Sequence, residues 1–301
     1  MSVRYKGYVM AITGASLWGI SGVVAQTMFH QYGFATEWLV SARMFVSGLL
    51  FLLIAQFRAG QSVLHIWKQN ESRQSLLLFS AVGMLGAQYT FFASIYAGNA
   101  ATATLLQSLG PMVVMIYLAF RVRKIPSGRE IIALLFACLG VYLLVTNGSM
   151  NRLSISAAAV FWGLLTAVCI AFNSIQPKRM LETWGSSAVI GWGMLIGSLL
   201  LAVITRPWTM TEQIIWTLPS VFSLCFVILL GTLVPFFLYI DSLRFISATE
   251  ASLLSSIEPL VAVCASVMWL QSPMGLFEMG GAGFILLTVV LLSLQRPQPA
   301  K

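Results

Sequence analysis

The segment SATEASLLSSIEPL, residues 247–260, places a carboxylate and a helix breaker side by side in an apolar stretch. Burial disfavours the charged form of a carboxyl group, so Glu258 is a candidate for proton exchange linked to substrate movement. Pro259 has no backbone N–H and therefore leaves the carbonyl of Ser255 without its helical partner. The pair predicts a buried polar site. The structural alternative is that Glu258 only hydrogen-bonds backbone or serine groups near the kink.

The composition places this segment in a membrane protein. Of the 301 residues, 58% are hydrophobic and 9% are charged, against about 25% charged residues in soluble domains. Apolar runs of about 17–25 residues can cross roughly 30 Å of hydrocarbon. We therefore predict an all-α integral membrane protein with ten transmembrane helices, near 6–29, 37–57, 74–97, 99–120, 129–147, 154–176, 187–204, 221–243, 247–270 and 277–294.

The predicted helices place Glu258 close to the centre of the bilayer. It lies about eleven residues into the run at 247–270, or about 16 Å at 1.5 Å per residue. A charge facing lipid at that depth costs at least about 2.5–3.5 kcal/mol, so Glu258 should face a pocket or a partner. Pro111 frees the carbonyl of Gln107 in the same way. Such breaks are tolerated only where they line a cavity or meet another helix.

An internal repeat relates the two breaks. On a shift of 148 residues, NAATATLLQSLGP at 99–111 lies over SATEASLLSSIEP at 247–259, with six identities in thirteen positions. Near the starts of the halves, LWG at 17–19 corresponds to FWG at 161–163. These matches predict two five-helix repeats, 1–148 and 149–301, in a single membrane domain. An odd number of helices per repeat gives the two copies inverted topology.

The basic residues predict an orientation. With the N-terminus in the cytoplasm, fourteen of the seventeen Lys and Arg residues fall in inner segments, and only Arg152 and Arg206 fall in outer ones. The positive-inside rule therefore favours cytoplasmic N- and C-termini in a bacterial-type plasma membrane. The net charge of +8 then marks this side of the membrane rather than a nucleic-acid partner. Arg43 lies within the second run, where we expect an interfacial anchor or a partner for an outer carboxylate rather than a ligand-binding group.

Aromatic and amide side chains recur at the depth of Glu258. Trp18 and Trp162 are related by the repeat, and each precedes a glycine that permits close helix approach. Indoles on opposite walls of a pocket could stack on an apolar ring or attract a cationic amine, worth about 2 kcal/mol when desolvated. Packing within the membrane is the alternative. The candidate substrate-binding residues are Trp18, Gln88, Tyr89, Phe92, Gln107, Trp162, Trp192, Tyr239 and Glu258.

The stretch beginning at Phe236, FFLYIDSLRFISATEASLLSSIEPL, together with LWG and FWG, resembles the drug/metabolite transporter superfamily in its EamA-like branch. The resemblance covers nearly the whole chain. It implies ten helices around a central cavity, alternating access, and cavity-lining places for Trp18, the turn from Gln88 to Phe92, Trp162, Tyr239 and Glu258. The family often has a Gly-Glu pair after the ninth helix, whereas this chain has Gln271, so the role of that acid is absent or transferred.

The leading hypothesis is a secondary active transporter that exports amino acids or related metabolites, with protons as a candidate coupling ion and no cofactor or metal. Uptake of a quaternary amine such as choline is the alternative. An intramembrane enzyme would need a base beside Ser21 of GISG, yet the two histidines, His30 and His65, fall at a helix end and in a loop. Small-residue helix faces permit a monomer or a dimer in the lipid bilayer.

Overall fold

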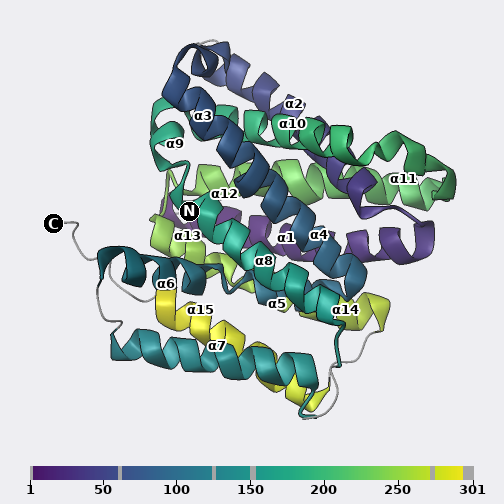
Figure 1. Ribbon diagram of the computed structural model, residues 1–301, viewed down its shortest axis with the longest axis vertical. Coiled ribbons are helices and arrows are strands. Elements are labelled where there is room, and N and C mark those ends of the chain that lie inside the picture. Colours follow the sequence, from purple (N-terminus) through teal and green to yellow (C-terminus); the bar gives the residue numbers. More distant parts are fainter. Residues whose placement is uncertain (1–2, 60–62, 124–126, 150–153, 272–274, 294–301) are drawn as a thin grey trace.

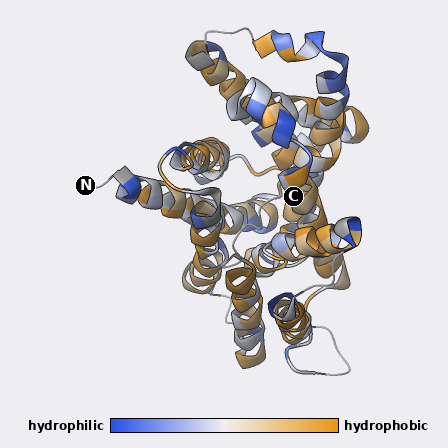
Figure 2. Ribbon diagram, turned by 90° about the vertical axis from the view of Figure 1, so that its left-hand side faces the viewer, coloured by the Kyte–Doolittle hydropathy of each residue, from blue (hydrophilic) through white to orange (hydrophobic). Residues whose placement is uncertain are grey.

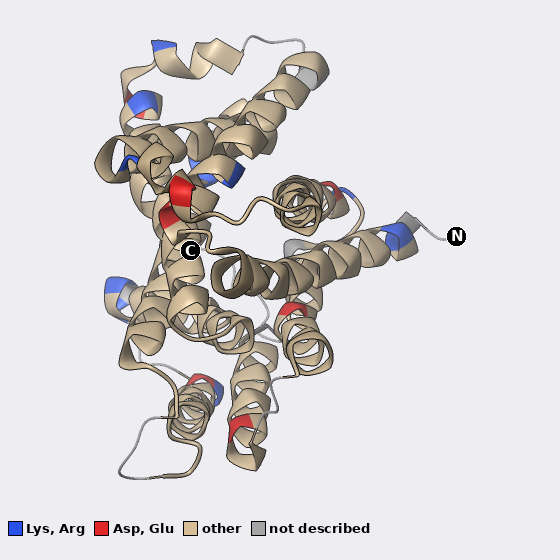
Figure 3. Ribbon diagram, turned by 90° about the vertical axis from the view of Figure 1, so that its right-hand side faces the viewer, with Lys and Arg blue, Asp and Glu red and all other residues tan. Residues whose placement is uncertain are grey.

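The computed structural model describes residues 3–59, 63–123, 127–149, 154–271 and 275–293, and its regular elements in these ranges are helical (Figure 1). The basic residues Lys124, Arg152, Arg296 and Lys301 lie outside the described residues. Apolar residues dominate along the ribbons (Figure 2), and charged residues are sparse (Figure 3). This distribution is that of a protein whose helices face lipid as well as one another.

The helices follow one another along the chain with short connections. In the first half they are α1 (Val3–Tyr32), α2 (Thr36–Ala59), η1 (Val63–Lys68), α3 (Asn70–Leu78), η2 (Phe79–Gly86), α4 (Ala87–Ala97), α5 (Ala100–Gln107), α6 (Gly110–Val122) and α7 (Gly128–Thr146). In the second half they are α8 (Ala157–Ile175), α9 (Lys178–Trp184), α10 (Ser186–Thr205), η3 (Pro207–Gln213), α11 (Leu218–Cys225), η4 (Phe226–Leu233), α12 (Val234–Ser242), α13 (Ala248–Ser255), α14 (Ile257–Leu270) and α15 (Leu276–Ser293).

Among the described residues, nine helical segments are long and apolar enough to cross a membrane. Four of them combine shorter elements, such as α5 with α6 and α13 with α14. The tenth predicted span corresponds to α15, which is a shorter apolar helix in the part of the chain that the structure describes. The multi-pass helical architecture is therefore confirmed, while the count of ten stays a prediction.

The predicted breaks at Pro111 and Pro259 are confirmed. α5 ends at Gln107 and α6 begins at Gly110, with Pro111 in its first turn. In the same way, α13 ends at Ser255 and α14 begins at Ile257. Because proline lacks the N–H that a helix interior needs, it is accommodated in the first turn after each break.

Two wider helical turns were not predicted. η2 and η4 are π-helical segments, and each lies in the middle of a span, between α3 and α4 and between α11 and α12. In η4, the Thr232 hydroxyl donates to the carbonyl of Val227, five residues back, at 2.8 Å. π-helical turns are rare in proteins overall, but those that occur are often found at functional sites. Their equivalent places in the two halves indicate that they belong to the repeated unit.

The helix contacts recur with the two halves exchanged. α1 packs against α12 and α14, while its counterpart α8 packs against α4, α5 and α6. α2 pairs with α10, and α7 pairs with α15. In Figure 1 these last two pairs lie on opposite flanks of the molecule, with α1, α4 and α8 between them. The central helices and the two flanking pairs therefore all join one half of the chain to the other.

One contact of α1 has no polar equivalent in the other half. The Gln26 Oε1 atom accepts a hydrogen bond from the Ala100 N–H at the start of α5, at 2.8 Å. Gly22, one turn earlier on α1, also lies against Ala100. The residue that corresponds to Gln26 on the shift of 144 is Ile170, which has no side-chain acceptor. Instead, Ile170 lies against Gly110.

Replacing Gly281 by alanine should destabilise the protein, because α7 and α15 approach each other there without room for a side chain. A Cβ atom on Gly281 would lie 2.6 Å from the Gly140 carbonyl oxygen and 2.7 Å from the Leu144 nitrogen. We expect a loss of about 1–3 kcal/mol, the usual cost of overpacking, measured as a lower melting temperature in detergent. Gly280→Ala is the matched control, since nothing lies within 4 Å of its Cβ position. Equal melting temperatures for the two variants would contradict the prediction.

Candidate functional site

The centre of the candidate site is a hydrogen bond between the two broken helices. The side-chain amide of Gln107, at the end of α5, donates to the Glu258 Oε1 atom, near the start of α14, over 2.5 Å. Both side chains are half-buried. Glu258 therefore has a side-chain partner from the other half of the chain, and the interpretation that it bonds only near its own kink is wrong.

Two glycines hold the broken helices in place. A Cβ atom on Gly19 of α1 would lie 2.6 Å from the Glu258 carbonyl oxygen, so α1 touches the backbone of α14 at this point. A Cβ atom on Gly163 of α8 would lie 2.9 Å from the Leu106 Cβ atom, next to Gln107. Small residues permit this close approach of membrane helices. The repeated Trp-Gly pairs thus position the two members of the hydrogen bond.

The indoles that precede these glycines pack on aromatic rings of the other half. Trp18 contacts Phe236 at 5.0 Å and Tyr239 at 5.7 Å between ring centroids, both on α12. Trp162 contacts Tyr89 of α4 edge to face at 5.8 Å. All four of Trp18, Trp162, Tyr89 and Tyr239 are half-buried. The indoles therefore form related contacts on the two sides, as expected for symmetry-related walls.

Polar groups that the sequence did not single out lie along the same helices. The hydroxyl groups of Ser21 on α1 and Ser256 at the break before α14 are buried and make no hydrogen bond with the described residues. Buried polar atoms without partners cost free energy, so they mark places where a ligand group could bind. The Ser21 hydroxyl has no base as a partner among the described groups, and His30 stacks on Tyr96 instead. This arrangement gives no support to the intramembrane-enzyme alternative.

The start of α1 is joined to the start of α13 by hydrogen bonds and an ion pair. Arg4 and Tyr8 both donate to the Glu250 carboxylate, at 2.5 and 2.9 Å. Glu250 also completes a capping box with Ser247 at the start of α13. Asp241, at the end of α12, forms an ion pair with Arg244, three residues later, at 3.1 Å. These contacts join the start of α1 to α13 and lie near the connection between α12 and α13.

Three predicted site residues have no recorded contact with Gln107 or Glu258 in the described part of the chain. The Trp192 indole donates to the Val63 carbonyl oxygen at 3.0 Å and packs on Trp67 of η1. Phe92 is 1% exposed, so its ring is covered by neighbours. Gln88 is half-buried beside Tyr89 on α4. The structure thus groups Trp18, Gln107, Tyr239 and Glu258 and the pair of Tyr89 with Trp162, while Trp192 contacts the connection after α2.

Arg43 differs from its expected role at the membrane interface. Its side chain is 3% exposed, and its guanidinium carbon lies 4.3 Å from the centre of the Phe92 ring. Glu37, the carboxylate closest to it along α2, instead accepts a hydrogen bond from the Tyr89 hydroxyl at 2.9 Å. Arg43 is therefore a buried residue between α2 and α4, and the interpretation as an interfacial anchor is wrong.

The candidate site has no obvious metal ligands. Within the described ranges, no group of three or more His, Cys, Asp and Glu side chains could hold a metal ion. The site instead combines one carboxylate, amides, unpartnered hydroxyl groups and aromatic faces. Such a set can bind a small organic molecule through hydrogen bonds and ring contacts.

The chain is similar to known membrane transporters over its whole length. Residues 5–146 and 157–294 match the EamA-like transporter family, one match in each predicted half. The chain is 35% identical to "Uncharacterized inner membrane transporter YicL" of Salmonella typhimurium, over 100% of the chain and 99% of that protein. It is 22% identical to "Protein PecM" of Dickeya dadantii, over 67% of each. A crystal structure with 16% identity superposes with a TM-score of 0.63 over 96% of both chains, which shows the shared fold.

A double-mutant cycle tests the hydrogen bond between Gln107 and Glu258. We expect Gln107→Leu and Glu258→Leu to be coupled by about 0.5–3 kcal/mol in thermal stability, because either change alone leaves the other polar group unpartnered. Gln88→Leu is the matched amide control, and its effect should add to that of Glu258→Leu. Additive effects of Gln107→Leu and Glu258→Leu would contradict the predicted coupling.

Proposed function

Because the chain belongs to the EamA-like transporter family, we propose that it moves small organic metabolites by alternating access between two inverted halves. The helix contacts support this proposal, since α1 with α12 and α14 corresponds to α8 with α4 and α5 after the halves are exchanged. Inverted repeats are a common way to build a site that opens to either side. Each state would then use equivalent contacts of the opposite half.

The observation that carries the proposal is the hydrogen bond between Gln107 and Glu258. It joins the breaks of both halves, so a relative motion of the halves changes the surroundings of both side chains. Broken helices supply substrate sites near the bilayer midplane in many transporters. We place the substrate beside this hydrogen bond, between the walls that Trp18 and Trp162 form, with Tyr239 and Tyr89 as their ring partners.

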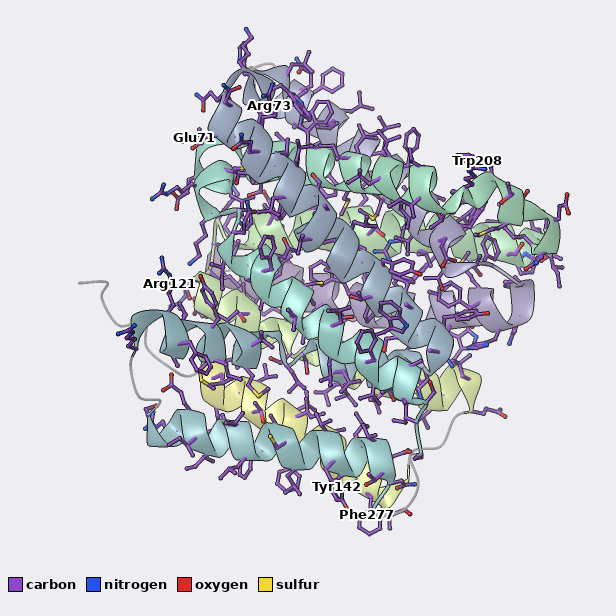
Figure 4. The ribbon with its side chains drawn as sticks, viewed as in Figure 1. Glu71, Arg73, Arg121, Tyr142, Trp208 and Phe277 are labelled. Atoms are coloured by element: carbon purple, nitrogen blue, oxygen red, sulfur yellow. The ribbon has the colours of Figure 1, made fainter. Side chains whose placement is uncertain are left out.

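We propose the inner membrane as the location and cytoplasmic termini as the orientation. The name of the Salmonella relative supports the location. The basic residues support the orientation: Figure 4 shows Arg73 and Arg121 toward one end of the molecule and Trp208 toward the opposite end. The positive-inside rule makes the arginine-bearing end cytoplasmic.

Export of amino acids or related metabolites is the first candidate activity. The single carboxylate at the helix breaks and the unpartnered hydroxyl groups of Ser21 and Ser256 support a polar substrate. The ring cluster of Trp18, Phe236 and Tyr239 favours uptake of a quaternary amine such as choline as the alternative. An aromatic face binds a permanent cation without a hydrogen bond.

Transport assays in proteoliposomes should separate the two activities. We expect counterflow of labelled amino acids with the wild-type protein, and a large loss of this counterflow in Trp18→Ala because one wall of the site is removed. Trp208→Ala is the matched control, since Trp208 is exposed at the far end of the molecule. Saturable choline movement that Trp18→Ala abolishes, without amino-acid counterflow, would overturn the first candidate.

Proton coupling through Glu258 predicts a separation of exchange from net transport. In Glu258→Gln, the amide can still pair with Gln107 but cannot bind and release a proton. We expect counterflow to persist, while a proton gradient no longer drives net substrate movement or changes its rate. The exposed Glu212→Gln variant serves as control and should behave like wild type. A gradient response in Glu258→Gln equal to that of wild type would show that Glu258 is structural.

A further inference from the structure

Arg43 is a buried cation without a counter-ion. The chain has nine Asp and Glu residues, and all nine lie in the described residues. The ion pairs recorded among these residues join Arg4 with Glu250 and Arg244 with Asp241. Within the same ranges no hydrogen bond of Arg43 is recorded, and its Nε atom is buried without a partner.

The surroundings of Arg43 hold the guanidinium group without neutralising it. Its guanidinium carbon lies 4.3 Å from the centre of the Phe92 ring, a cation–π contact that fixes one face of the group. Ser47, one turn further along α2, donates to the Ile228 carbonyl of η4. Contacts with α4 and with η4 thus set the position of this part of α2. The Nε–H group of Arg43 has no hydrogen-bond acceptor among the described residues.

The contacts of α4 connect Arg43 with the candidate site. Tyr89 and Phe92 lie three residues apart and therefore on one face of α4. Tyr89 contacts Trp162, and Phe92 contacts Arg43. The Tyr89 hydroxyl also donates a hydrogen bond to the carboxylate of Glu37. Glu37 therefore has a partner other than Arg43. Arg43 is thus one helical turn along α4 from the aromatic wall of the site.

An unpaired guanidinium group in a membrane-spanning helix is costly, so it persists where a function needs it. Its planar set of N–H donors matches the two oxygens of a carboxylate. We propose that Arg43 binds the carboxylate group of the transported metabolite, which supplies the missing counter-ion during transport. This inference rests on the proposed function and restricts its substrates to organic anions and zwitterions that carry a carboxylate.

The first experiment measures the ligand-free protein in detergent. Arg43→Met replaces the cation with an apolar chain of similar length, so the melting temperature should rise above that of wild type. Arg73→Met, at an exposed arginine, is the matched control and should leave it unchanged. A melting temperature of Arg43→Met at or below that of wild type would show a structural role for Arg43 and overturn the proposal.

The second experiment measures binding by thermal stabilisation, with each proteinogenic L-amino acid, its amide, and choline as probes. Wild-type protein should bind a carboxylate-bearing probe roughly tenfold or more tightly than its amide. Arg43→Gln should lose this preference, and Arg43→Lys should restore part of it, since lysine keeps the charge but not the planar donor set. Equal binding of acid and amide by wild type, or an unchanged preference in Arg43→Gln, overturns the proposal.

The two experiments, together with the counterflow assay in proteoliposomes, separate failure of the inference from failure of the proposed function. If amino acids move through the wild-type protein and Arg43→Gln moves them as well, the proposed function stands and the role of Arg43 falls. If choline alone stabilises the wild-type protein, the amino-acid candidate and the role of Arg43 fall, while transport of a small organic metabolite stands. If no probe stabilises it, the proposed amino-acid substrate loses support, and the melting temperature of Arg43→Met decides the role of Arg43 on its own.

Discussion

The structure depends on one constraint, which is that a polar group deep in the membrane must find its partner within the protein. Gln107 and Glu258 meet this constraint for each other at the two helix breaks. The close approach of Gly19 and Gly163 to the broken helices makes the meeting possible. The Trp-Gly pairs and the proline breaks are repeated in both halves, whereas Gln107 and Glu258 each occur in one half only and join the two halves by a single hydrogen bond.

Sequence reasoning predicted the parts of this arrangement that local chemistry determines. A proline removes a backbone donor in any surroundings, so the breaks at Pro111 and Pro259 could be placed from the sequence alone. Long apolar runs likewise predict spans, since their length must match the bilayer. The partner of Glu258 could not be predicted, because Gln107 is 151 residues away and becomes its neighbour only through helix packing.

Residues near the ends of spans were harder to interpret. Arg43 lies seven residues after the start of α2, a depth that suits an interfacial anchor as well as a buried group. Only the position of α4, which brings the Phe92 ring to its guanidinium group, distinguishes these roles. For Trp192 the sequence predicted a substrate-binding residue, whereas its indole lies against the connection after α2. Gly83 and Gly231 correspond on the shift of 148 residues and lie in the two π-helical turns, but they did not predict these turns.

The two halves differ in the hydrogen bond that joins α5 to α1, between Ala100 and Gln26. An alternating carrier built from identical halves would rest equally in its two end states, because exchanging the halves converts one state into the other. The Ala100 N–H donates to Gln26 and so joins α5 to α1, whereas Ile170, at the corresponding position of α8, has no side-chain acceptor. In the proposed alternating-access cycle, this difference would make the two end states unequal in free energy, so the empty protein would present its site more often to one face of the membrane than to the other.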